Sequence, residues 1–108
     1  YLKWFFPKHP DFLVLLSKDG KRGKEISETL SSASPVQVLN VDFPPLVNSF
    51  YRMSDNMNYH DFGFRSFLLT DTAAVRNLNY HELTDTPDTL NYVNMSHITT
   101  GLAKFLER

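Results

Sequence analysis

The first part of the sequence combines a continuous apolar run with an amphipathic segment. Residues 12–16 are all apolar and are bounded by Pro10 and by a Ser-Lys-Asp-Gly turn, which is typical of a strand buried on both faces of a sheet. We therefore interpret this run as a central strand. Ile26 and Leu30 stand at i and i+4 spacing and predict a short amphipathic helix over residues 24–33.

The middle of the chain contains two further strand patterns separated by a short helix. Residues 36–43 alternate between β-branched and polar side chains until two prolines end the pattern, so they predict a second strand. Ser54 or Asp55 can serve as the N-cap of a short helix that ends at Gly63. The apolar residues 64–70 then predict a third strand.

The last segment has the clearest helical pattern. Asn91 can cap a helix that runs to about Glu107. One face of this helix is apolar and consists of Met95, Ile98, Leu102, Phe105 and Leu106. Strands that alternate with helices predict an α/β fold with a mainly parallel sheet, in which binding sites lie beyond the carboxyl ends of the strands.

Size and composition favour one small globular domain over residues 1–108. The chain has 108 residues, of which 42% are hydrophobic and 14% aromatic, so there is ample material for a packed core. The net charge of −1 gives no basic field for nucleic acid or anionic lipid. No apolar run approaches the roughly 20 residues of a membrane span. Since the chain has no cysteine, a metal ion would have to be held by His, Asp or Glu.

Four histidines are present, and their surroundings differ. His9 and His97 fit an ordinary loop and a half-exposed helix, and His60 pairs locally with Asp61. His81 lies near Glu82 and Asp85, either of which could accept a hydrogen bond from the second ring nitrogen of a metal-bound imidazole. Spacing alone leaves open whether His81 binds a metal or is a surface residue.

Two blocks of the sequence together resemble a known enzyme family. The first block is Ser-Asp-Asn at residues 54–56, followed by Gly-Phe at residues 63–64. The second is Tyr80-His81 followed by Asp-Thr-Pro-Asp-Thr-Leu at residues 85–90. Residues 53–106 resemble the C-terminal part of the co-catalytic di-zinc exopeptidases, the family of bacterial leucyl aminopeptidases, glutamate carboxypeptidases and glutaminyl cyclases. The sequence departs from the family pattern at two places. Asn56 stands where the family usually has a histidine, and Phe64-Arg65 stand where it usually has small residues.

The resemblance assigns roles to individual residues. It implies that His81 is a zinc ligand and that Tyr80 donates a hydrogen bond to the tetrahedral intermediate. If His81 is a ligand, its position in the chain makes Asp85 the carboxylate that we expect to accept a hydrogen bond from the second ring nitrogen. It also implies a substrate pocket, formed by Asp55, Asn56, Tyr59 and Phe62.

The same resemblance implies that this chain is an incomplete C-terminal portion of a three-layer sandwich and is inactive alone. The reaction needs two zinc ions, held by five ligands, and a glutamate base, and residues 1–50 contain none of the motifs that supply them. The whole protein would be an aminopeptidase acting on peptides, and many bacterial members are exported, which favours an exported or periplasmic location. Aminopeptidase, carboxypeptidase and cyclase chemistry stay open.

Two other interpretations remain open from the sequence. One is a non-catalytic domain of the same fold that binds protein, and the other is a small α/β module unrelated to peptidases. If residues 1–108 were complete, an unpaired sheet edge and the apolar Trp4, Phe5 and Phe6 would predict a homodimer.

Overall fold

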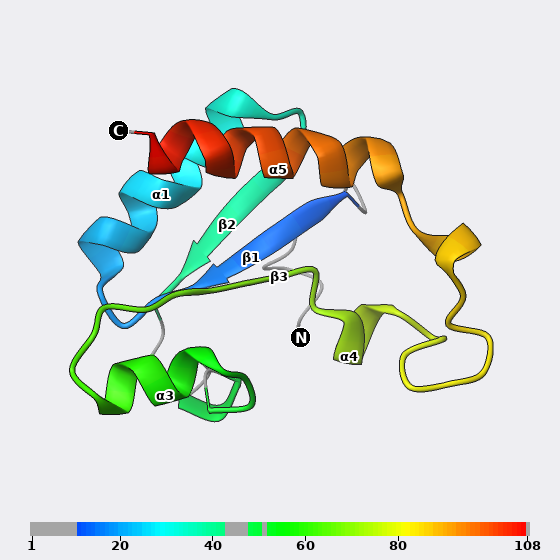
Figure 1. Cartoon of the computed structure of the whole chain (residues 1–108), viewed down its shortest axis with the longest axis horizontal. Coiled ribbons are helices and arrows are strands. Elements are labelled where there is room, and N and C mark those ends of the chain that lie inside the picture. Colours follow the sequence, from blue (N-terminus) through cyan, green and yellow to red (C-terminus); the bar gives the residue numbers. More distant parts are fainter. Residues whose placement is uncertain (1–10, 43–47, 51, 108) are drawn as a thin grey trace.

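A computed structural model describes residues 11–42, 48–50 and 52–107, and these residues form a mixed α/β structure (Figure 1). The sequence prediction that the chain is α/β is therefore confirmed at this level. In chain order the elements are β1 (Phe12–Leu16), α1 (Gly20–Ala33), β2 (Gln37–Val41), α3 (Asn56–Asp61), β3 (Leu68–Thr70), α4 (Ala73–Arg76), the 3-10 turn η2 (Pro87–Thr89) and α5 (Tyr92–Leu106).

The sheet has three strands in the order β2-β1-β3, so the predicted central strand is confirmed. β1 and β2 are parallel, with Phe12 opposite Gln37, as expected for strands joined by a crossover helix. β3 is antiparallel to β1, with Val14 opposite Thr70, which differs from the expected mainly parallel sheet. The reason is that α3 lies at the edge where β1 and β2 end instead of crossing the sheet, so the chain returns directly (Figure 1).

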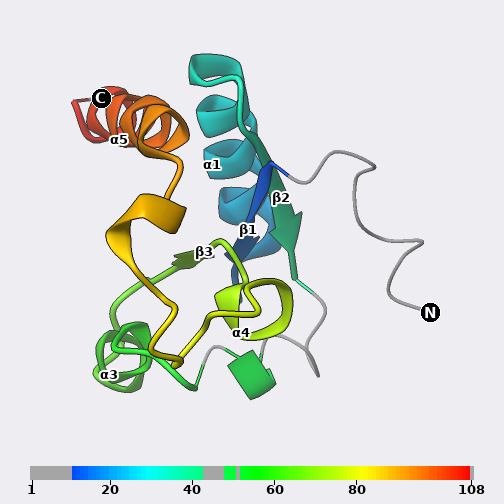
Figure 2. The same cartoon turned by 90° about the vertical axis from the view of Figure 1, so that its right-hand side faces the viewer.

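Both faces of β1 are buried, as its unbroken apolar run predicts. Helices α1 and α5 lie side by side over one face (Figure 2). The core beneath them consists of Leu15, Ile26, Leu30, Val36, Val38 and Ile98. On the opposite face Phe12, Val14 and Leu16 are buried, and Leu39, Val41, Phe50 and Leu68 pack against them.

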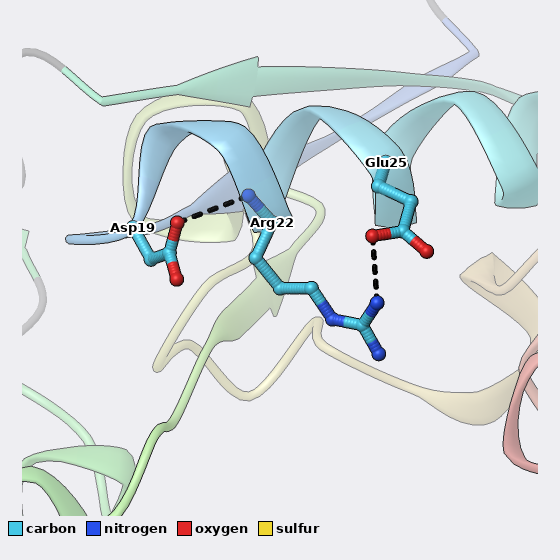
Figure 3. A network of polar contacts seen from close by, with 3 residues as sticks. All are labelled: Asp19, Arg22 and Glu25. Carbon is cyan, nitrogen blue, oxygen red and sulfur yellow. Dashed lines mark hydrogen bonds and ion pairs between the residues drawn. The ribbon is translucent and has the colours of Figure 1, made fainter.

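The two long helices begin at side-chain caps. α1 begins at Gly20, four residues earlier than the predicted residue 24, because the Asp19 carboxylate accepts a hydrogen bond of 3.0 Å from the Arg22 backbone N–H (Figure 3). The Arg22 side chain is paired in turn with Glu25. α5 confirms the prediction closely, since Asn91 Oδ1 accepts from the Asn94 N–H at 3.0 Å.

The remaining boundaries are narrower than predicted. The second strand occupies Gln37–Val41 within the predicted residues 36–43, and the third occupies Leu68–Thr70 within residues 64–70. Phe43 lies outside the described residues, as do the three aromatic and apolar residues near the start of the chain on which the dimer prediction partly depends. None of the helices in the described ranges is long and apolar enough to cross a membrane.

Candidate functional site

The candidate site is the irregular segment between β3 and α5, which begins with a left-handed residue. Thr72 has φ 61°, and its backbone N–H donates to Thr70 Oγ1 at 2.9 Å. Asp71 Oδ1 then accepts from the Ala73 N–H at 2.9 Å. These local bonds turn the chain sharply away from the strand and start the single turn of α4.

Arg76, the last residue of α4, fixes this segment to the sheet. Its Nη1 atom donates to the backbone oxygen of Phe12 at 2.9 Å and to that of Asp71 at 3.0 Å. The guanidinium carbon also lies 3.8 Å from the centroid of the Phe12 ring, within the range of a cation–π contact. The segment that follows is therefore anchored at the edge where β1 begins.

This position corrects one expectation from the sequence. In a mainly parallel sheet, binding sites lie beyond the carboxyl ends of the strands, so both candidate blocks would lie at the edge where α3 is found. Because β3 runs antiparallel, the chain leaves it at the opposite edge, and α4 with the loop after it lies on that side (Figure 1). The prediction was wrong for the block that contains His81.

Asn77 closes the loop that carries Tyr80 and His81. Its side-chain Oδ1 accepts from the Asn79 N–H at 2.9 Å, and its Nδ2 donates to Asp85 Oδ1 at 3.3 Å. The Asn77 backbone oxygen accepts from the Tyr80 N–H at 3.2 Å. One residue thus connects the start of the loop to its far side.

His81 lies at the tip of this loop in an uncommon backbone conformation. Its φ is 63°, and the Glu82 N–H donates to the Asn79 backbone oxygen at 2.8 Å across the turn. Histidine tolerates left-handed φ better than most residues, but such a conformation still has to be imposed by its surroundings. The imidazole is exposed and stacks on the Tyr80 ring, with centroids 4.1 Å apart and planes inclined by 20°. It is accessible to an ion or a partner.

Tyr80 lies in the second block, but it borders a hollow that the start of the first block also borders. It lines a hollow of about 330 Å³ together with Met53 and Ser54. The floor of this hollow is the apolar sheet face that includes Val14, Leu16 and Leu68. The loop of His81 and residues 53–54 therefore border one cavity, although the loop follows β3 in the chain and residues 53–54 precede it.

The predicted substrate-pocket residues do not all meet there. Tyr59 and Phe62 are exposed and line a separate shallow hollow of about 180 Å³. Asp55 precedes α3 and is exposed, and the backbone oxygen of Asn56 accepts from Ser66 Oγ at 2.8 Å. The structure brings Tyr80 and His81 together but separates them from Tyr59 and Phe62.

Two residues that position the site were missed in the sequence. Arg76 acts through a contact with Phe12, which is far away in the chain. Asn77 binds Asp85, the carboxylate predicted to support His81. An asparagine that accepts from the backbone two residues later is a common turn signal, and this could have indicated Asn77. Within residues 11–42, 48–50 and 52–107, no three His, Asp or Glu side chains are grouped so that they could hold a metal ion.

Comparisons with known proteins identify one related sequence. The chain is 28% identical over 107 residues to a protein of Escherichia coli K12 named "Uncharacterized protein YfbL", an alignment that covers 97% of the chain. The chain spans about one third of that relative, 33% of its length. No family model matches the sequence, and no solved structure matches it.

Proposed function

We propose that this chain is the C-terminal portion of a zinc-dependent aminopeptidase of the co-catalytic di-zinc exopeptidase family, with His81 as one zinc ligand. The observation that carries the proposal is the exposed imidazole of His81, held at φ 63° on a hydrogen-bonded turn beside Tyr80. Left-handed residues other than glycine are uncommon and cluster at functional sites, because the surrounding structure has to impose the conformation.

The chemistry of the residues present fits part of such a centre. An accessible neutral imidazole is a good zinc ligand, but a catalytic zinc ion requires three or more protein ligands. The remaining ligands, the glutamate base and the other layers of a three-layer sandwich would therefore come from polypeptide outside this chain. When bound, the metal pair would supply a water molecule of lowered pKa as the nucleophile.

Tyr80 would contribute to catalysis through its hydroxyl group. Tyr80 is 42% exposed as a residue and lines the hollow over the sheet. In the proposed reaction this hydroxyl donates a hydrogen bond to the oxygen that becomes negatively charged when the peptide carbonyl is attacked. A donor of this kind stabilises the transition state more than the substrate.

The test is an aminopeptidase assay on the full-length protein, with aminoacyl-anilide substrates. Removal of metal with a chelator should abolish activity, and added zinc should restore it. Tyr80→Phe should lower kcat by about 10²-fold while the zinc content stays constant, which is the usual effect of losing an oxyanion donor. The matched control is Tyr92→Phe, whose hydroxyl donates to the Pro87 backbone oxygen at 2.9 Å and which should keep normal kcat. Unchanged kcat in Tyr80→Phe would remove the proposed role.

One observation favours the alternative, a non-catalytic domain of this fold that binds protein. Leu78 and Leu83 flank His81 in the chain and are 97% and 101% exposed. Exposed leucines on both sides of the loop suit a protein contact. A full-length protein without zinc and without peptidase activity, whose binding to a protein is lost in Leu83→Asp, would support this alternative against the enzyme.

A further inference from the structure

We propose that Asn77 is the positioning residue of the site, and that its side-chain amide sets the conformation in which His81 and Tyr80 are presented. This inference rests on the proposed function, and it names the residue that holds the loop in the conformation needed for His81 to bind zinc. Asn77 does not touch substrate in this proposal; it acts through the turn that it closes.

The two ends of the Asn77 side-chain amide make different hydrogen bonds. Its oxygen accepts from the Asn79 N–H at 2.9 Å, and its nitrogen donates to Asp85 Oδ1 at 3.3 Å, eight residues further along the chain. An aspartate could make only the first bond, because its carboxylate has no donor, and a serine is too short to make both. Asparagine is the residue whose side chain matches both demands.

The loop buries little apolar surface. Its two leucines are almost fully exposed, and every residue from position 80 to position 90 is exposed. Burial of apolar surface therefore contributes little here, so hydrogen bonds and backbone preferences decide the conformation. A left-handed residue such as His81 costs about 1–3 kcal/mol and persists only where its neighbours impose it. The two sides of the turn are connected by the bonds of Asn77 and by the backbone bond from the Glu82 N–H to the Asn79 oxygen, and the Asn77 side chain supplies the bond that reaches Asp85.

Engagement of Asp85 adds a second consequence. A carboxylate near a metal-bound histidine orients the ring and raises its basicity. Asn77 holds Asp85 on the same loop as His81 by the bond of its Nδ2 atom. The His81 ring stacks on Tyr80 and, within the described residues, makes no hydrogen bond to Asp85. Loss of Asn77 should therefore act by loosening the turn and by releasing Asp85 from its place on the loop, so that the imidazole spends less time in the binding orientation.

The experiment compares Asn77→Ala with Asn79→Ala in the full-length protein. Asn79 lies in the same turn, but in the described part of the chain only its backbone groups take part in the bonds above. Asn77→Ala should weaken zinc binding by about 10–100-fold, the usual effect of losing an outer partner of a ligand. Hydrogen exchange of the Tyr80 and Glu82 amides should become about tenfold faster, which corresponds to one ordinary hydrogen bond. Asn79→Ala should change neither quantity.

A pair of exchanged residues tests the bond to Asp85 directly. Asn77→Asp alone keeps the acceptor for the Asn79 N–H but faces Asp85 with a like charge, so exchange at Glu82 should accelerate. Asn77→Asp combined with Asp85→Asn restores one donor and one acceptor with their positions reversed. Amide protection in the double variant should return toward the wild-type value, although zinc affinity need not, because the carboxylate has moved.

The outcomes separate this inference from the proposed function. Faster exchange together with weaker zinc binding in Asn77→Ala supports it. Unchanged amide exchange overturns it, as does a loosened turn with unchanged zinc affinity. A protein in which zinc does not depend on His81 overturns the proposed function itself, and that result is obtained from His81 variants without any change at Asn77.

Discussion

The sheet with α1 and α5 and the loop between α4 and α5 are stabilised in different ways. In the first region Leu15 and Leu30 are 2% and 0% exposed, and they pack between the sheet and its helices. In the second region Leu78 and Leu83 are almost fully exposed, and hydrogen bonds such as Asn77 to Asp85 close the turn. One region is held by burial, and the other by local polar contacts and backbone conformation.

This difference indicates which region determines the stability of the protein and which region orients its functional groups. Burial contributes most of the stability of a small domain, so the sheet and its helices should set the free energy of unfolding. A loop without buried side chains contributes little to that quantity, but it can hold a chemical group in one orientation. Substitutions in the two regions should therefore separate stability from function.

The largest expected effect is at the centre of the core. Leu30→Ala removes a fully buried side chain and should lower the free energy of unfolding by about 2–5 kcal/mol, as lost transfer energy and a cavity combine. Leu83→Ala is the matched control in the loop and should change the free energy of unfolding by less than about 0.5 kcal/mol. Urea unfolding measures both. A comparable loss in the two variants would contradict the division into two regions.

The next effect tests the close approach of α1 to the strands. A methyl group at Gly23 would meet the side-chain oxygen of Asn40 and lie 2.7 Å from Ser17 Cβ, a position that cannot move freely. Gly23→Ala should therefore cost about 1–3 kcal/mol by overpacking. At Gly101 a methyl group would lie 3.4 Å from Leu30 Cδ2, so Gly101→Ala should be neutral or stabilising. If both substitutions changed the free energy of unfolding in the same direction, the packing around Gly23 would be looser than these distances indicate.

The smallest effect concerns the backbone of the loop. At φ 63° a glycine is less strained than an alanine, so His81→Gly should be more stable than His81→Ala by about 1 kcal/mol. Leu83, which is not among the described residues with positive φ, should show the reverse order for its Gly and Ala variants. Thermal unfolding of the four variants gives the comparison. A higher melting temperature for His81→Ala than for His81→Gly would show that the surrounding residues do not impose the left-handed conformation at position 81.

The sequence predicted those parts of the fold that depend on nearby residues. The buried strand β1 and helix α5 with its Asn91 cap follow from periodicity and capping, which act over a few residues. The direction of β3 could not be predicted in this way, because it depends on whether the connection through α3 crosses the sheet or turns back at its edge. The error about the edge on which His81 lies follows from that single strand.

The site was predictable to a similar extent. The sequence singled out Tyr80 and His81 as neighbours on a loop, and the structure stacks their rings. It could not indicate that Arg76 contacts Phe12, since the two residues are 64 positions apart. It also grouped Tyr59 and Phe62 with the pocket by resemblance, whereas the structure gives them a hollow of their own. Contacts between distant segments depend on tertiary structure, which periodicity does not specify.

We propose that the imidazole at position 81 binds zinc in the full-length protein. Bound zinc per molecule, measured by elemental analysis after dialysis, tests it most directly in the wild type, His81→Ala and His97→Ala, the last being an exposed histidine on α5. We expect His81→Ala to lose zinc and aminopeptidase activity together, while His97→Ala keeps both. Full zinc content and full activity in His81→Ala would contradict the account.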